Sequence, residues 1–232
     1  MNPLLAYDDV WLIGGGGKTT LMFRLASAWA LRGESVICTT TTKIWARETS
    51  ACSDVRIDDF ASIVMGLRGR PAPLVVVASR IEEGKCHGFS ASEAMSLKPF
   101  ARHLVVEADG SAERPVKAHA SHEPVVASGA SCVIGVVGGW CVGAPLDAVH
   151  VHRPERFSAI TGLPIGAAVT AQNVARVILD EAGWVRAVPS CAAFHIVVTG
   201  TDNGIAEALT AHPRASRLDG IHLFSGGELN IL

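Results

Sequence analysis

The sequence lacks a large excess of charge of either sign, and it lacks any apolar run long enough to cross a bilayer. Lys and Arg number 20 against 22 Asp and Glu, a formal net charge of −2. Binding to nucleic acid needs a basic surface, so this balance argues against nucleic acid as a partner. The longest glycine-interrupted apolar stretch, CVIGVVGGWCVGA at 132–144, is too short to span a membrane. No signal-peptide pattern opens the chain, so we expect a cytoplasmic protein without a membrane partner.

No CxxC pair occurs among the six cysteines, which are Cys38, Cys52, Cys86, Cys132, Cys141 and Cys191. Several of them stand inside apolar stretches that resemble strands. In a reducing compartment such cysteines are most simply small buried apolar side chains, rather than ligands of a metal or parts of a redox centre. The sequence also shows no internal repeat and no low-complexity linker, so residues 1–232 are expected to form a single domain.

Short apolar runs alternate with longer mixed segments along the chain. The runs predicted to be strands are 9–13, 35–40, 74–79, 103–108, 132–137 and 194–200. The segment from Lys18 to Arg32 is predicted to be a helix, because its apolar residues recur on one face. The strands are apolar throughout, as expected of a parallel sheet covered on both faces. We therefore predict an α/β fold, with a doubly wound, mostly parallel sheet of the P-loop NTPase type.

The first predicted strand is followed by GGGGKTT at 14–20. Glycines adopt backbone angles that other residues avoid, so their N–H groups can converge on an anion, and the next helix adds its positive end. Lys18 is expected to contact the phosphates of a nucleotide, and the Thr19 hydroxyl to bind Mg²⁺. The loop is two residues tighter than the common G-x-x-x-x-G-K-[ST] pattern, and the alternative is a glycine turn with an incidental lysine. The predicted nucleotide-binding residues of this loop are Gly14, Gly15, Gly16, Gly17, Lys18, Thr19 and Thr20.

Two other strand ends carry polar groups that suit phosphate chemistry. In CTTTTKIW, after the second strand, we assign Thr41 to the nucleotide site, and an ordinary helix cap is an equal alternative. HLVVEADGS ends in Glu107 with Asp109 two residues on, and both carboxylates face one side if the strand continues. One can hold Mg²⁺ while the other orients an attacking group, although Asp-Gly also favours a simple turn. We predict Lys18, Glu107 and Asp109 as catalytic residues, and Thr19 and Glu107 as metal ligands.

Two later segments, RPVKAHASHEPVV and VHVHRPERF, are rich in histidine and charge. His119 and His122 have no third ligand at close spacing, so a metal site is not supported. The alternative interpretation of these segments is a polar surface loop without a binding role. In a doubly wound sheet both segments emerge at the edge where ligands bind. Cations, imidazoles and carboxylates together suit an anionic acceptor whose proton must be moved. The predicted acceptor pocket consists of Lys117, His122, Glu123, His152, Arg153 and Glu155.

The segment VVTGTDN at 197–203 lies where the guanine-reading motif N-K-x-D would follow a late strand. The Asn and Lys of that motif are missing, and only Asp202 remains. Guanine specificity is therefore not supported, and we expect ATP, with Mg²⁺, as the nucleotide.

Five stretches carry a family resemblance: GGGGKTTLMFRLA, TTTTKIW, EEGKCHGFS, VVEADGSAERPVKAHASHEPVV and HRPERF. Together they resemble the selenium-dependent hydroxylase accessory protein family (YqeC-type), also described as a selenium cofactor biosynthesis family. The resemblance runs from the first strand to about Ala175. It implies a cytoplasmic P-loop protein that assists the maturation of selenium-dependent molybdenum hydroxylases, with such a hydroxylase or its cofactor as a partner. It does not imply a defined reaction.

The leading functional hypothesis is an ATP-dependent enzyme, a P-loop ATPase or phosphotransferase, that activates or transfers a phosphoryl group during selenium cofactor assembly. The alternative from another class is a nucleotide-gated binding protein that delivers the cofactor to a partner enzyme. The G-x-x-G-K-T-T loop also resembles the central domain of Mur ligases and folylpolyglutamate synthases, which gives ATP-dependent ligase activity as a third hypothesis. A chain of 232 residues is expected to be too short for the substrate-binding domains of those ligases.

Overall fold

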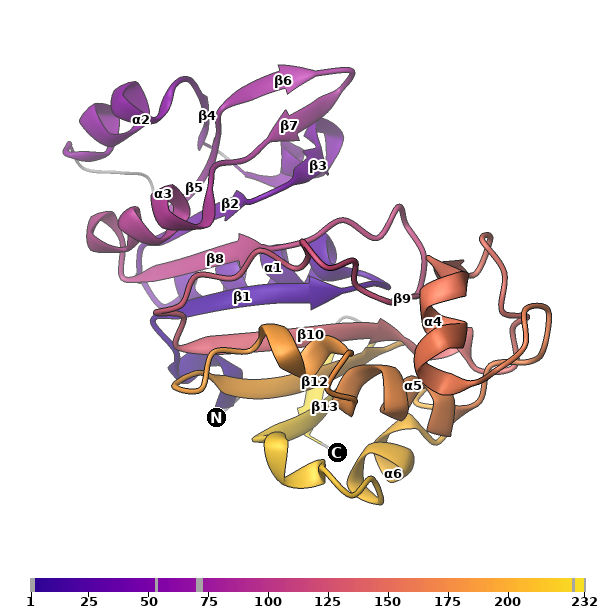
Figure 1. The fold of residues 1–232 in the computed structure, drawn as a ribbon. Coiled ribbons are helices and arrows are strands. Elements are labelled where there is room, and N and C mark those ends of the chain that lie inside the picture. The colour runs from indigo at the N-terminus through magenta and orange to yellow at the C-terminus, as the bar shows by residue number, and fades with distance from the viewer. Residues whose placement is uncertain (1–2, 53, 70–72, 227, 232) are drawn as a thin grey trace. The chain divides into compact units, whose positions relative to one another are not determined.

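The computed structural model describes residues 3–52, 54–69, 73–226 and 228–231 (Figure 1). The chain forms two compact units, and each is assembled from three separate segments. Unit 1 comprises Met1–Leu12, Thr19–Gly110 and Val125–Cys132, and unit 2 comprises Ile13–Lys18, Ser111–Pro124 and Val133–Leu232. Neither unit is a continuous stretch of chain. The single domain expected over residues 1–232 stays a prediction.

Unit 1 contains five parallel strands in the order β1-β8-β2-β5-β4. Their bounds are β1 (Asp9–Gly14, whose last two residues belong to unit 2), β2 (Val36–Thr40), β4 (Asp54–Ile57), β5 (Leu74–Ala78) and β8 (His103–Glu107). Strand β8 is late in the sequence, yet it lies between β1 and β2, as Figure 1 shows. Glu107 at its end pairs with Leu12 on one side and with Thr40 on the other. The carboxyl ends of these three strands are therefore neighbours.

Unit 1 also contains three α-helices and a small separate sheet. The helices are α1 (Lys18–Ala30, whose first residue belongs to unit 2), α2 (Phe60–Leu67) and α3 (Ala91–Ser96), with short 3-10 helices at Pro3–Ala6, Ala46–Ala51 and Lys98–Phe100. Helix α3 begins at a capping box, in which Ser90 and Glu93 satisfy each other's backbone N–H groups. The small antiparallel sheet has the order β3-β7-β6, formed by Lys43–Trp45, Lys85–His87 and Arg80–Glu82.

Unit 2 contains four strands in the order β10-β12-β13-β14. They are β10 (Cys132–Gly138), β12 (Ala193–Thr199), β13 (Gly220–Ser225) and β14 (Glu228–Ile231). Strands β12 and β13 are parallel, and β14 is antiparallel to β13. A second, parallel pair joins β9 (Val116–Lys117) to β11 (Val151–His152). The helices of unit 2 are α4 (Pro154–Thr161), α5 (Ala171–Leu179) and α6 (Ile205–Thr210), with 3-10 helices η4 (Gly139–Cys141), η5 (Trp184–Ala187) and η6 (Ala215–Arg217).

The predicted α/β fold with a mostly parallel sheet is confirmed. All residues of β1, β2, β8 and β10 are buried, as their uniformly apolar sequences predicted. The sequence analysis missed β4, β13 and β14 and the small strands, because these are short or only partly buried. Within the described parts of the chain, no helix is long and apolar enough to cross a membrane. The expectation that the cysteines are buried is wrong for Cys191, which is exposed, and for Cys52, which is partly exposed.

Candidate functional site

The glycine loop after β1 has a backbone that requires glycine at several positions. The φ angles of Gly14, Gly16 and Gly17 are 97°, 76° and 113°, in the region that other residues rarely adopt. A Cβ atom on Gly14 would lie 2.5 Å from Cη2 of Trp184, and one on Gly16 would lie 2.3 Å from the backbone nitrogen of Gly138. Both close approaches lie within unit 2. The loop is therefore shaped by its own backbone angles and packed tightly onto its neighbours.

The amide groups of this loop are not all available to an anion. The N–H of Gly15 donates to the carbonyl of Val136 (2.8 Å), and that of Gly16 donates to the carbonyl of Arg114 (2.9 Å). The expectation that all four glycine amides converge on an anion is therefore wrong for these two. Gly17 is exposed and leads into the first turn of α1, whose N–H groups have no partner within the helix by its geometry. An anion would therefore approach at Gly17 and the first turn of α1.

Lys18 follows the glycines and is almost completely buried. Its Nζ atom donates to the carbonyl oxygen of Gly14 (2.7 Å), so the side chain folds back along the loop. The hydroxyl of Thr199, at the end of β12, donates to the carbonyl oxygen of Gly16 (2.5 Å). These bonds hold the loop in one shape within unit 2, with an ammonium group beside its backbone.

In unit 1, two predicted metal ligands contact each other. The hydroxyl of Thr19 donates to Oε2 of Glu107 (2.7 Å), although the two residues are 88 positions apart. The contact exists because Glu107 ends β8, next to β1, from which the chain leads into α1. Hydroxyl and carboxylate oxygens are ligands that Mg²⁺ prefers. These two residues therefore fit the magnesium ion that a P-loop nucleotide brings.

The threonines after β2 bind the end of β8. The carbonyl oxygen of Glu107 accepts hydrogen bonds from the Thr40 hydroxyl (2.8 Å) and the Thr41 N–H (3.0 Å), and the Thr41 hydroxyl lies 3.5 Å from the carbonyl oxygen of Val125. Strand β3 follows at Lys43, so the alternative reading of these residues as a helix cap is wrong. Asp109 is fully buried, but β8 ends at Glu107, so the alternation that would have put both carboxylates on one side stops before Asp109.

In unit 2, two of the charged segments meet through the pair β9–β11. The register places Lys117 opposite His152. Lys117 is fully buried, and its Nζ donates to Oε2 of Glu123 (2.9 Å). The guanidinium of Arg153 donates to the same carboxylate oxygen (2.5 Å). Arg153 holds a left-handed backbone conformation (φ 65°), which is costly for a residue with a side chain.

The charges of this group shift the pKa values of its members. Burial raises the pKa of Glu123, but the hydrogen bonds from Arg153 and Lys117 outweigh burial and lower its pKa to about 2. Burial, and then the positive charges of Lys117 and Arg153, lower the pKa of His152 to about 4. At neutral pH the carboxylate is therefore ionised and the imidazole is neutral.

Two residues of the predicted acceptor pocket stay outside this charged group. The side chain of His122 is 76% exposed, with Nε2 4.0 Å from Oε1 of Glu123, and Glu155 is exposed in the first turn of α4. His119 is buried and its ring lies 5.5 Å from that of Trp184. Across the described residues, no three His, Cys, Asp or Glu side chains are grouped to hold a metal ion.

The sequence analysis missed Trp184, which has a central position in unit 2. Its Nε1 donates to the carbonyl oxygen of Lys117 (2.9 Å), and its ring occupies the space that a side chain at Gly14 would need. Trp184 thereby contacts both the glycine loop and the backbone of Lys117. It lies in a stretch without a recognisable motif, so no local signal marks it.

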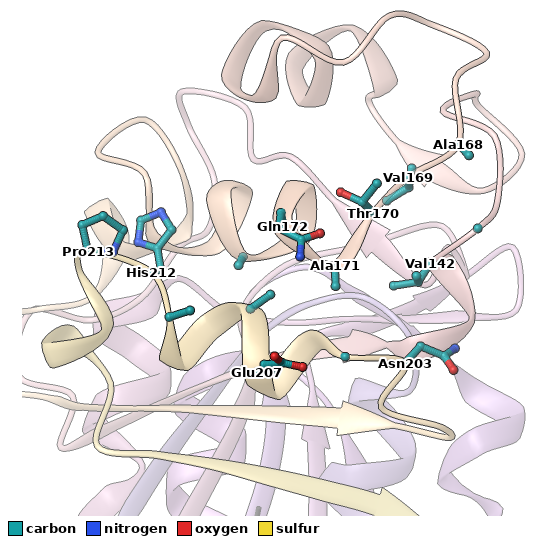
Figure 2. Close-up of a pocket in the computed structure, with 15 residues that line it drawn as sticks. Val142, Ala168, Val169, Thr170, Ala171, Gln172, Asn203, Glu207, His212 and Pro213 are labelled. Atoms are coloured by element: carbon teal, nitrogen blue, oxygen red, sulfur yellow. The ribbon is translucent and has the colours of Figure 1, made fainter.

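The segment after β12 contains Asp202 and lines part of a cavity. Both carboxylate oxygens of Asp202 are engaged, by the N–H groups of Gly204 (3.0 Å) and Ala206 (2.9 Å), so this residue caps α6 rather than presenting acceptors to a guanine. A cavity of about 670 Å³ lies between α5 and α6, lined mainly by small and apolar residues (Figure 2). Asn203 is among the labelled lining residues, whereas none of the residues predicted for the site lines it.

Comparisons with known proteins agree with the resemblance. The sequence model of a family described as "YqeC protein" matches residues 10–155. A protein of Escherichia coli (strain K12), named as the uncharacterized protein YqeC, is 33% identical over 180 residues, which are 77% of this chain and 70% of that protein. Among solved structures, FtsY from Mycoplasma mycoides matches 97% of this chain with a TM-score of 0.42 and 14% identity. This chain covers 64% of that FtsY chain, less than two thirds of its length.

Proposed function

The chain belongs to the YqeC protein family, and on that premise we propose that it is a Mg-ATP-binding and Mg-ATP-hydrolysing accessory protein in the maturation of selenium-dependent molybdenum hydroxylases. We propose that it activates or transfers a phosphoryl group during assembly of the selenium cofactor. The observation that carries the nucleotide part is the hydrogen bond between Thr19 and Glu107, directly after a glycine loop and Lys18. That combination of ligand types and positions is what Mg-bound phosphates need.

Each residue of the proposed nucleotide site has a role that follows from its chemistry. Lys18 offers positive charge to the β- and γ-phosphates, and the N–H groups at the start of α1 add donors. Thr19 and Glu107 hold the magnesium ion, and Asp109 is proposed to orient the attacking group. Thr41 is held at the end of β8 by its bond to Glu107. Mg-ATP supplies the phosphoryl group that is transferred or released.

The fully buried Lys117 and the partly buried Glu123, His152 and Arg153 together support the acceptor half of the proposal. This group contains two cationic side chains for one carboxylate, an excess of positive charge that favours an anion. The imidazole of His152 is neutral at neutral pH, so it can accept or donate a hydrogen bond to the acceptor without adding charge. His122 and Glu155 are exposed, and their contact with an acceptor stays a prediction.

The proposal is tested by measuring ATP turnover by the purified protein, with and without Mg²⁺. We expect Mg²⁺-dependent turnover in the wild type and its loss in Lys18→Ala, because that side chain acts on phosphate charge and adds little to packing. The matched control is Lys43→Ala, which removes an exposed lysine of β3. Equal ATP affinity and turnover in Lys18→Ala and the wild type, with both folded by circular dichroism, would show the nucleotide assignment to be wrong.

A second set of turnover measurements distinguishes phosphoryl transfer from nucleotide-gated delivery. Selenide, molybdopterin species and an apo-hydroxylase are added in turn to the same turnover measurement. A rise with a small-molecule acceptor supports phosphoryl transfer. A rise only with the apo-hydroxylase supports a nucleotide-gated delivery protein instead.

A further inference from the structure

Trp140 differs from the fully buried tryptophans of this chain. Trp11, Trp29 and Trp184 have no exposed surface, whereas Trp140 is 53% exposed. It stands in η4, the 3-10 turn that directly follows β10. Its neighbours in that turn, Gly139 and Cys141, are buried. Ligands bind at the carboxyl ends of the strands in sheets of this kind, and the half-exposed Trp140 ring lies at such an end.

The position of the Trp140 ring is set by two glycines. A Cβ atom on Gly138 would lie 2.7 Å from Cζ2 of the ring, and one on Gly200 would lie 3.4 Å from Cε3. The benzene part of the indole therefore packs against the backbone of both glycines, while about half of the side chain stays exposed. The turn itself is fixed, because the side-chain amide of Asn203 donates to the carbonyl of Gly139 (3.0 Å). An aromatic ring held in this way loses little freedom when a ligand stacks on it.

The same backbone segments support the glycine loop. The nitrogen of Gly138 would lie 2.3 Å from a Cβ atom on Gly16, and Thr199, next to Gly200, donates its hydroxyl to the carbonyl of Gly16. Gly138 is thus a direct neighbour of the phosphate loop within unit 2, and Gly200 follows the residue that bonds to that loop. The Trp140 turn and the loop proposed to bind the phosphates therefore share the same supporting backbone.

We propose that Trp140 is the stacking platform for the purine base of the nucleotide bound at the glycine loop. The inference rests on the proposed nucleotide site. Stacking uses the face of the base, which adenine and guanine share, so it does not choose between them. Asp202, the one remnant of a guanine-reading motif, is occupied as the cap of α6. The platform therefore contributes to the affinity for ATP and GTP alike and adds nothing to the affinity for a bare polyphosphate.

Open space adjoins this turn. The cavity between α5 and α6 begins at Val142, two residues after Trp140, and includes Asn203, which binds the carbonyl of Gly139 (Figure 2). Its mostly small and apolar lining suits the flat, weakly polar body of a nucleoside. The cavity therefore begins close to the turn that carries Trp140.

Calorimetry on three variants with three ligands tests the proposal. The variants are Trp140→Leu, Trp140→Phe, which keeps an aromatic face, and Trp45→Leu as a control that removes a partly exposed tryptophan from β3. The ligands are Mg-ATP, Mg-GTP and Mg-tripolyphosphate. We expect Trp140→Leu to weaken ATP and GTP binding by about tenfold or more. Trp140→Leu should bind tripolyphosphate with the affinity of the wild type. Trp140→Phe and Trp45→Leu should bind all three ligands with the affinity of the wild type.

Tryptophan fluorescence adds a readout of the stack itself. ATP and GTP should quench the emission of the wild type, tripolyphosphate should not, and the quench should vanish in Trp140→Phe although binding persists. Equal ATP affinity in Trp140→Leu and the wild type would overturn the platform while leaving the nucleotide site intact. Equal losses for ATP and tripolyphosphate would also overturn it, because the loop rather than the base would be affected. If the wild type bound none of the ligands, the proposed function would fall with it.

Discussion

Glu107 has two roles through two different groups. Its carboxylate accepts the hydroxyl of Thr19, and its carbonyl accepts the Thr40 hydroxyl and the Thr41 N–H. Glu107→Gln keeps the carbonyl and the size of the side chain but removes the charge that a metal ion needs. We expect the concentration of Mg²⁺ for half-maximal ATP turnover to rise about 10- to 100-fold. Asp109→Asn should slow turnover more than it weakens binding, because its proposed role is in the attack.

A titration of ATP turnover with Mg²⁺ checks both substitutions at this residue scale. Glu83→Gln, which removes an exposed carboxylate from the turn between β6 and β7, is the control and should titrate like the wild type. If Glu107→Gln and Asp109→Asn both kept the wild-type titration and rate, the acidic pair would be a structural turn only.

At the scale of elements, the junction between β1 and α1 depends on glycine for two separable reasons. Gly14 combines a positive φ with close approaches to Trp184 and to the carbonyl of Val136, whereas Gly33, after α1, has a positive φ in open space. Gly33→Ala should cost only the backbone strain, about 1 kcal/mol of unfolding free energy. Gly14→Ala should cost roughly 3 kcal/mol or more, because the methyl group must also displace a packed indole. Urea unfolding of the two variants measures the difference, and equal losses would mean that the loop is not held against Trp184.

At the scale of the whole molecule, buried histidines make stability depend on pH. His195 and His222 lie on neighbouring strands, β12 and β13, with 3.2 Å between Nδ1 of the first and Nε2 of the second. Burial, and then the charge of His195, lower the pKa of His222 from 6.5 to about 4, and burial also lowers that of His195 against an opposing effect of Asp219. Below about pH 6.5 His222 is protonated in the unfolded chain, whereas in the folded protein it is protonated only below about pH 4. Stability should therefore fall across that interval, by roughly 2 kcal/mol for His222 between pH 7 and pH 5.

Unfolding free energies measured at pH 7 and at pH 5 test this dependence. His222→Gln cannot titrate, so it should lose less stability over the interval than the wild type, whatever its stability at pH 7. His122→Gln is the matched control, because His122 is largely exposed, and its loss should equal that of the wild type. If His222→Gln lost as much unfolding free energy between pH 7 and pH 5 as the wild type, the pair of His195 and His222 would not cause the loss of stability in acid.

The local features of this protein could be predicted from the order of its residues alone. The succession of a strand, a glycine loop and a helix over residues 9–30 could be predicted, because glycine conformations and apolar periodicity depend only on neighbouring residues. The same holds for the six central strands and for the family, whose motifs are short stretches.

Which of these local features contact one another depends on the order in which the strands pack. The placement of β8 between β1 and β2 brings Glu107 to Thr19, and the pair β9–β11 brings Lys117 and Arg153 to Glu123 while leaving His122 outside. The amides of Gly15 and Gly16 are taken by carbonyls of distant segments, which no local pattern reveals. The physical reason is that one set of apolar strands is compatible with many strand orders. The order is chosen by the packing of the whole chain, and contacts across it follow from that choice.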